Sequence, residues 1–177
     1  ERILSFGKLR ASWAKVGRDT DPYRTSYSYP SAGSFNGSPM YQLDPSIPLL
    51  NLKPEITTNI ELGTELIFFN GRIGFDFTWY HSNTRNQILP ASVSATSGYA
   101  TAIINSGEIS NNGIEIQLRT VPVEKKNFRW NADFNFAHNK NKVIALTEGL
   151  EAYQLFYQWN LTVEARPGNA YGDIVGY

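Results

Sequence analysis

The chain has 177 residues, with 16 basic and 16 acidic side chains, so its formal net charge at neutral pH is zero. A neutral chain argues against a nucleic-acid partner, because the phosphates of DNA and RNA require a basic surface. Cysteine is absent, which excludes disulfides, thiol nucleophiles and cysteine-ligated zinc. The sequence also lacks the run of about 18 apolar residues that a membrane-spanning helix needs.

The composition favours an all-β protein with many turns. Tyrosine and phenylalanine occur 10 times each and tryptophan 4 times, and aromatic residues are enriched in strands. Glycine, asparagine and β-branched residues interrupt every candidate helix. The chain begins Glu1-Arg2-Ile3 without an initiator methionine or a signal peptide. We therefore expect it to be a piece of a longer protein.

The first predicted strand covers residues 6–16, where Leu9, Ala11 and Trp13 alternate with Arg10 and Ser12. Such period-two alternation is typical of a strand with one apolar and one polar face. A long connection rich in serine, proline, glycine and tyrosine follows, over residues 17–54.

A β-hairpin is predicted around Asn70-Gly71, because this dipeptide favours the two positive φ angles of a type I′ turn. The flanking segments, residues 60–68 and 73–80, both alternate. The apolar row is Ile60, Leu62, Leu66, Phe68, Ile73, Phe75, Phe77 and Trp79. A two-residue turn places Glu65 opposite Asp76 on the polar face. A slip of one residue would move Glu65 among the phenylalanines, so the register is strongly specified.

Two further strands are predicted at residues 114–119 and 128–136, where apolar residues alternate with charged residues and amides. Residues 122–127 form a short polar turn between them, and one more strand is expected within residues 153–165. Long loops over residues 83–107 and 139–153 complete the pattern. Short turns that alternate with long loops are typical of an outer-membrane barrel, with periplasmic turns and extracellular loops.

An alternating strand also fits a soluble β-sandwich, for instance a carbohydrate-binding module, whose apolar face packs on a second sheet. Three features favour the membrane barrel: charged polar faces, strands of about 10 residues, and aromatic residues near strand ends, which suit membrane interfaces. Those aromatic residues are Phe68, Phe69, Trp79, Tyr80, Phe128 and Trp130. On this interpretation Leu62, Leu66, Phe75, Phe77, Ile116 and Phe134 face lipid.

Several segments resemble TonB-dependent outer-membrane transporters of the SusC/RagA-like branch. The most specific are Leu52-Lys53-Pro54-Glu55-Ile56-Thr57, Phe69-Asn70-Gly71-Arg72-Ile73 and Asn105-Ser106-Gly107-Glu108-Ile109. Residues 9–17, 76–80, 84–89 and 166–177 are similar to the same family. The resemblance therefore runs through nearly the whole chain.

The resemblance implies a barrel expected to have 22 strands, plugged by an N-terminal domain and located in the bacterial outer membrane. Such transporters import oligosaccharides or peptides with energy delivered by TonB, and a SusD-like surface lipoprotein usually caps them. Residues 1–177 would be a portion of the barrel domain without the plug. Five or six strands cannot close such a barrel, so this stretch alone would not transport.

No catalytic, cofactor-binding or metal-binding residue is predicted, and the substrate-binding residues are unknown. His81 and His138 stand alone, and a strand-end or loop role is expected for both. Glu61, Glu65 and Asp76 form a carboxylate cluster. It could act as an acid/base pair, but we expect it to line the barrel lumen beside Arg119 or the plug.

Glycines at four-residue spacing near the C-terminus resemble a membrane-helix motif, but the intervening proline, asparagine and aspartate exclude it. The long loops carry aromatic residues whose ring faces could stack on sugars. These are Tyr23, Tyr27, Tyr29, Tyr41, Tyr99, Phe156, Tyr157 and Trp159. No single one of them is assigned to substrate contact.

Overall fold

The computed structural model describes residues 3–22 and 24–176, and these residues form an all-β structure. Tyr23 and Tyr177, which the sequence interpretation includes, lie outside the described residues. The helical elements found are two single 3-10 turns, Phe69–Gly71 and Ala95–Ser97. Among the described residues, no helix has the length and apolar character needed to span a membrane. The prediction of an all-β chain is confirmed.

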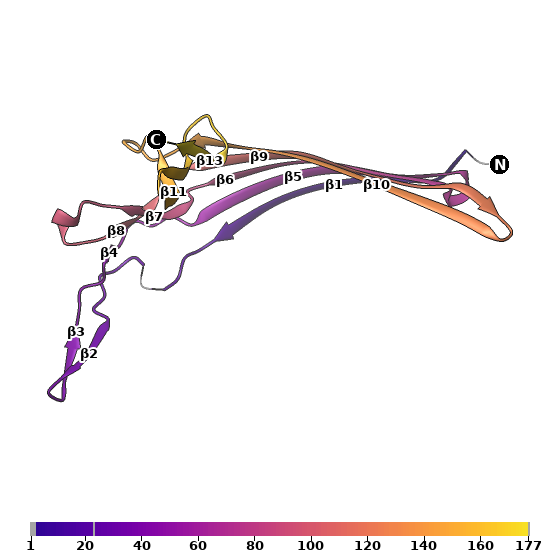
Figure 1. The fold of residues 1–177 in the computed structure, drawn as a ribbon. Coiled ribbons are helices and arrows are strands. Elements are labelled where there is room, and N and C mark those ends of the chain that lie inside the picture. Colours follow the sequence, from indigo (N-terminus) through magenta and orange to yellow (C-terminus); the bar gives the residue numbers. More distant parts are fainter. Residues whose placement is uncertain (1–2, 23, 177) are drawn as a thin grey trace. The chain divides into compact units, whose positions relative to one another are not determined.

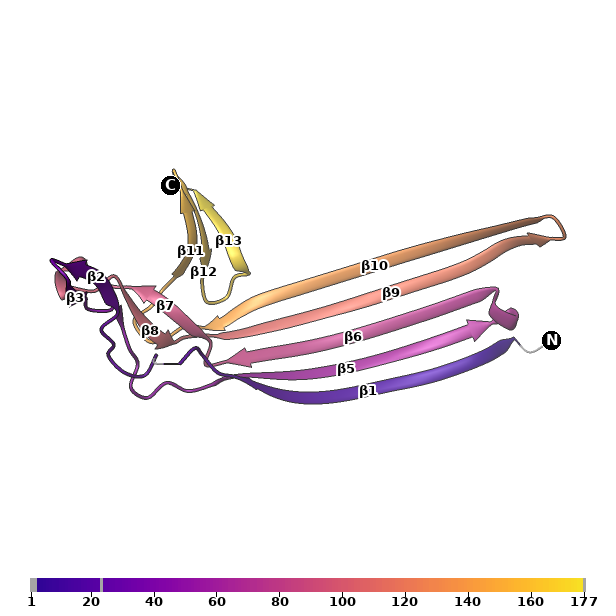
Figure 2. The ribbon, with the colours of Figure 1, turned by 90° about the horizontal axis from the view of Figure 1, so that it is seen from below.

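The main element is a five-stranded sheet with the order β1-β5-β6-β9-β10 (Figures 1 and 2). Neighbouring strands run in opposite directions (Figure 2). The strands are β1 (Leu4–Arg18), β5 (Glu55–Phe68), β6 (Ile73–Arg85), β9 (Glu108–Lys125) and β10 (Phe128–Ala145). With 13 to 18 residues each, they exceed the length of about 5–6 residues usual in globular proteins.

The chain divides into two compact units. We call the first the wall unit; it comprises Glu1–Lys15, Thr57–Asn83 and Ile109–Lys142. We call the second the loop unit; it comprises Val16–Ile56, Thr84–Glu108 and Val143–Tyr177.

The described residues of the wall unit form a single layer, because each of its three segments contributes to the same sheet. Large apolar side chains therefore stay uncovered within the unit: Leu62 is 49% exposed and Phe134 is 60% exposed. Leu66, Phe75, Phe77 and Ile116 are partly exposed. A soluble sandwich would bury such rows under a second sheet. The single layer instead fits a wall whose apolar face meets lipid.

The predicted type I′ turn is present at Asn70-Gly71. Asn70 has φ 56° and ψ 37°, Gly71 has φ 95°, and the Arg72 N–H donates to the Phe69 carbonyl at 3.3 Å. Phe69 also has a positive φ of 50°, and its N–H donates to the carbonyl of Ile3 at 3.0 Å. Phe69 therefore lies between the end of β5, at Phe68, and the turn at Asn70-Gly71.

The polar turn predicted at residues 122–127 is wrong in its extent, because β9 continues to Lys125 and only residues 126–127 link it to β10. Val121 donates its N–H to the Arg72 carbonyl at 2.8 Å, next to the first residue of β6. Beyond this point β6 offers no further residues for pairing. Pro122 therefore lies where β9 has become an edge, and an edge strand tolerates a proline.

The loop unit contains strands where long loops were predicted. β2 (Ser31–Phe35) pairs with β3 (Ser38–Tyr41), and β4 (Ser46–Ile47), β8 (Thr101–Asn105) and β7 (Ile88–Ser92) form a three-stranded sheet in that order. These strands have 2 to 5 residues. Such short segments carry little periodicity, so the sequence did not reveal them.

The tail holds three strands, although only one was predicted. β11 (Tyr153–Gln158), β12 (Leu161–Ala165) and β13 (Tyr171–Gly176) form an antiparallel sheet. The turn between β11 and β12 contains Trp159 with φ 56°. A tryptophan is not a usual turn residue in a left-handed conformation, which explains why sequence reasoning read one strand through it.

Candidate functional site

Two ion pairs occupy the polar face of the wall unit. Arg10 on β1 reaches Asp76 on β6, with Nη2–Oδ1 at 2.7 Å and Nη1–Oδ2 at 3.0 Å. It also donates to the Thr78 hydroxyl at 3.2 Å. To reach β6, Arg10 has to cross β5, which lies between. A Cβ placed on Gly63 would lie 3.0 Å from the Arg10 guanidinium, so the missing side chain of Gly63 allows this crossing.

The second pair crosses β6 from the opposite direction. Arg119 on β9 approaches Glu65 on β5, with Nη2–Oε1 at 4.0 Å. Its side chain passes over Gly74, because a Cβ built there would meet both Cβ and Nε of Arg119 at 3.7 Å. Two arginines thus reach inward over glycines to carboxylates on the central strands. Each pair connects strands that are not hydrogen-bonded to each other.

The predicted carboxylate cluster is therefore balanced by two bases. Glu65 and Asp76 lie on the polar face, as predicted, and Arg119, which was expected beside the cluster as an alternative to the plug, pairs with Glu65. Sequence reasoning missed Arg10 as the partner of Asp76. The signal was present: Arg10 lies on the polar row of its strand. Whether Glu65 and Asp76 are directly opposed stays a prediction. Both acids pair with guanidinium groups, so the arrangement suits structural ion pairs better than acid/base chemistry.

A third crossing lies further along the polar face. Tyr80 lies across β9 at Gly113, where an added Cβ would overlap the end of the tyrosine side chain, closest to its Cζ. The Tyr80 hydroxyl then donates to Asn139 on β10 at 3.2 Å. Tyr80 thus belongs to the polar row, since strand alternation turns it away from Trp79, and a place at the membrane interface stays a prediction.

The two histidines show no shared site. His81 forms a hydrogen bond with Asn112 across β6 and β9 at 2.5 Å, and His138 is exposed on β10. Within residues 3–22 and 24–176, no group of three or more histidine, aspartate or glutamate side chains could hold a metal.

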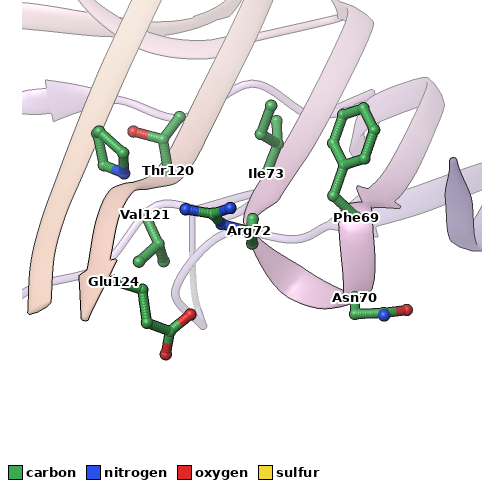
Figure 3. Close-up of a pocket in the computed structure, with 8 residues that line it drawn as sticks. Phe69, Asn70, Arg72, Ile73, Thr120, Val121 and Glu124 are labelled. Atoms are coloured by element: carbon green, nitrogen blue, oxygen red, sulfur yellow. The ribbon is translucent and has the colours of Figure 1, made fainter. Parts of the chain in front are cut away.

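Two hollows open on the wall unit. The larger, of about 650 Å³, lies between the start of β6 and the bend of β9 (Figure 3). Phe69, Ile73 and Val121 supply apolar lining, and Arg72 and Glu124 supply charge. The smaller, of about 390 Å³, lies between β6, β9 and β10. Its polar lining is Asp76, Thr78, Glu115, Gln117 and Asn135.

The aromatic residues singled out in the loops do not converge on one site. Tyr27 and Tyr99 approach each other with ring centroids 6.5 Å apart. Most of the rest lie exposed, in the loop before β2, on β3, and on β11 and the turn after it: Tyr29, Tyr41, Phe156, Tyr157 and Trp159. Trp159, at the turn after β11, is 84% exposed. Tyr153 instead donates to the Pro90 carbonyl at 3.2 Å, and partial burial, with a smaller contribution from Tyr171, raises the pKa of its phenol.

Comparison with known proteins identifies the protein family to which the chain belongs. Residues 4–173 match the family model described as "TonB dependent receptor-like, beta-barrel". The chain belongs to this family. It is therefore part of an outer-membrane protein, and its resemblance to the SusC/RagA-like branch is confirmed.

Two relatives and one solved structure illustrate this similarity. "TonB-dependent receptor P26" of Formosa agariphila is 34% identical over 80% of the chain and 15% of its own length. "TonB-dependent receptor SusC" of Bacteroides thetaiotaomicron is 27% identical over 83% of the chain and 16% of its own length. The solved "RagAB peptide transporter" superposes with a TM-score of 0.80 at 18% identity, over 95% of this chain and 18% of that one.

The chain thus spans less than a fifth of these proteins. The two relatives are named as receptors and the solved structure as a transporter, and none of the three as an enzyme. The structural likeness, at 18% identity, supports the fold and not a substrate.

Proposed function

We propose that residues 1–177 are a portion of the barrel domain of a TonB-dependent importer of oligosaccharides or peptides. In this proposal the five long strands form part of the barrel wall, and the loop unit contributes extracellular segments. The plug, and the segment through which the TonB complex acts, belong to other parts of the protein. The stretch described here has no catalytic role.

The observation that carries the proposal is the contrast between the two faces of the wall unit. One face carries the arginine–carboxylate pairs of Arg10 and Arg119, and the other carries exposed apolar residues such as Leu62 and Phe134. A charged group facing lipid is costly, whereas the lumen of a barrel is polar and hydrated. The sandwich alternative would leave the apolar row without a second layer.

The loop unit supports substrate capture at the cell surface. Exposed aromatic rings such as Tyr29, Tyr157 and Trp159 offer faces for stacking on sugars and edges for contact with peptides. The proposal includes a SusD-like lipoprotein on the same side, as the family resemblance implies.

Uptake by the complete receptor tests the proposal. A strain that lacks the gene is complemented with it, and the uptake of labelled oligosaccharides and of labelled oligopeptides is measured with and without TonB. The proposal expects uptake of one class that disappears without TonB. Equal uptake of both classes in cells with and without the receptor would contradict it.

A further inference from the structure

Three consecutive residues, the last of β8 and the two that link it to β9, tie together distant parts of the loop unit. Asn105 holds Lys53 with two hydrogen bonds: its Oδ1 accepts from the Lys53 N–H at 2.7 Å, and its Nδ2 donates to the Lys53 carbonyl at 2.8 Å. The same Nδ2 donates to the Asn86 carbonyl at 3.0 Å. One amide side chain therefore satisfies backbone groups of two segments that lie more than 30 residues apart in sequence.

Ser106 adds two more links. Its side chain is fully buried, with 0% exposure. Its backbone N–H donates to the Gln87 carbonyl at 2.7 Å, and its hydroxyl accepts from the Thr147 N–H at 3.2 Å. The Thr147 hydroxyl in turn donates to the Asn105 carbonyl at 2.9 Å. A buried group that is bonded in this way is costly to disrupt, because its partners would be left unsatisfied.

Gly107 completes the arrangement. Its φ of 96° lies in the region that favours glycine, and a Cβ there would lie 3.4 Å from the Ala145 carbonyl and 3.6 Å from Leu146. A side chain at this position would therefore meet backbone strain, although its Cβ would make only ordinary contacts.

The bonded positions all lie just outside the long strands. Lys53 precedes β5, Asn86 and Gln87 follow β6, Thr147 follows β10, and residues 105–107 themselves precede β9. Beyond these points the chain continues into residues 19–52, 88–104 and 148–176, which carry the exposed aromatic residues. The bases of three separate loop segments are thus joined by one tripeptide.

We propose that Asn105-Ser106-Gly107 is a loop clasp, in which Asn105 is a positioning residue for substrate capture. The clasp fixes the spacing of the three loop bases, so that loops far apart in sequence are held in one preorganised arrangement. Preorganisation lowers the ordering cost of binding. The capture role rests on the proposed import function, whereas the clasp itself does not depend on it.

Replacing Asn105 by aspartate tests the clasp directly. Aspartate has nearly the same shape and can still accept from the Lys53 N–H, but it cannot donate to the carbonyls of Lys53 and Asn86. Asn105→Asp therefore removes two bonds and places a carboxylate beside two carbonyl oxygens. The matched control is Asn36→Asp, at an exposed turn residue with φ 47° between β2 and β3.

The experiment uses the complete receptor in lipid nanodiscs and measures amide hydrogen exchange, with uptake measured in cells. Asn105→Asp is expected to speed exchange at least about tenfold around residues 53, 87 and 147. Exchange in residues 60–68 of the wall is expected to stay unchanged, which excludes general unfolding. For uptake, KM should rise several-fold at an unchanged maximal rate per receptor. Asn36→Asp should alter neither readout.

Unchanged exchange at all three loop bases, in both Asn105→Asp and Asn105→Ala, would overturn the clasp. Faster exchange with an unchanged KM would overturn the positioning role. Absence of uptake by the wild-type receptor would count against the import function instead, and the exchange measurement would still decide on the clasp.

Discussion

The wall unit and the loop unit are stabilised in different ways. The long strands of the wall are held by backbone pairing, and few of their large side chains are buried: Leu9, Trp13, Leu62 and Phe134 are among those that stay exposed. The loop unit buries several small or polar side chains, including Ser106, Thr162 and Glu164, and it relies on bonds from side chains to backbone.

On the proposed function, this difference follows from the surroundings of each unit. A barrel wall has lipid on one side, so its apolar rows need no core of their own, and strand pairing must satisfy every backbone group. Extracellular segments lie in water, where short strands gain little from burial and need specific bonds to hold one conformation. Strand pairing therefore stabilises the wall unit, and specific hydrogen bonds stabilise the loop unit.

The largest effect is expected from a charge on the apolar face of the wall. Leu62→Arg should destabilise the folded receptor by about 2–4 kcal/mol, because it exposes a guanidinium to hydrocarbon. Gln117→Arg, on the polar row of β9, is the control and should change stability little. Urea unfolding in lipid vesicles measures both. Equal losses for the two variants would remove the distinction between the faces.

The second effect compares an ion pair of the loop unit, in which only the carboxylate is buried, with an exposed pair of the wall. Arg166 Nε lies 2.6 Å from Glu164 Oε1, and the Glu164 side chain is only 5% exposed. Arg166→Gln should cost about 2 kcal/mol, since a buried carboxylate loses its charged partner. Arg129→Gln breaks the exposed pair with Glu124 at 3.6 Å and should cost less than about 1 kcal/mol. Hydrogen exchange near each pair measures the difference, and a reversed order would contradict the comparison.

The third effect concerns the tight turn of the wall. Gly71 has φ 95°, and no atom lies within 4 Å of the position where its Cβ would be. Gly71→Val should therefore cost on the order of 1–2 kcal/mol through backbone strain alone. Gly71→Asn should cost clearly less, because asparagine tolerates a positive φ. Unfolding measurements that rank the two variants equally would argue against the type I′ turn.

The smallest effect is expected where Tyr80 crosses Gly113. Gly113→Ala displaces the tyrosine ring and breaks its bond to Asn139, which should cost about 1 kcal/mol. Gly74→Ala is the control, since its Cβ would make only ordinary contacts with Arg119 at 3.7 Å. Thermal unfolding of the two variants checks the ranking, and a loss for Gly113→Ala no larger than that for Gly74→Ala would contradict a stabilising role of the Tyr80–Asn139 bond.

The sequence predicted the wall well, because long strands repeat a two-residue pattern often enough to reveal both faces. The Asn70-Gly71 turn and the polar placement of Glu65 and Asp76 followed from this pattern, and Arg119 was expected beside them as an alternative to the plug. Arg10 was missed as the partner of Asp76 because alternation assigns a residue to a face without saying how far its side chain reaches, and this contact depends on Gly63 lacking a side chain.

The structure of the loop unit could not be predicted from periodicity. Its strands are short, and its bonds join residues such as Asn105 and Lys53 that no spacing rule connects. The resemblance identified residues 105–109 as a family segment without explaining them. The physical role of Asn105 became visible only when the three backbone partners could be located in space.

The most direct test of the account is whether neighbouring residues of one wall strand face different media. Single cysteines are placed at positions 131–136 of β10 in the complete receptor, carry spin labels, and are examined in lipid vesicles for access to oxygen and to a water-soluble nickel chelate. The account predicts a period of two, with labels at Phe134 and Phe136 accessible to oxygen and labels at Asp133 and Asn135 accessible to nickel. Equal access of nickel to all six positions would contradict a wall with one face in lipid.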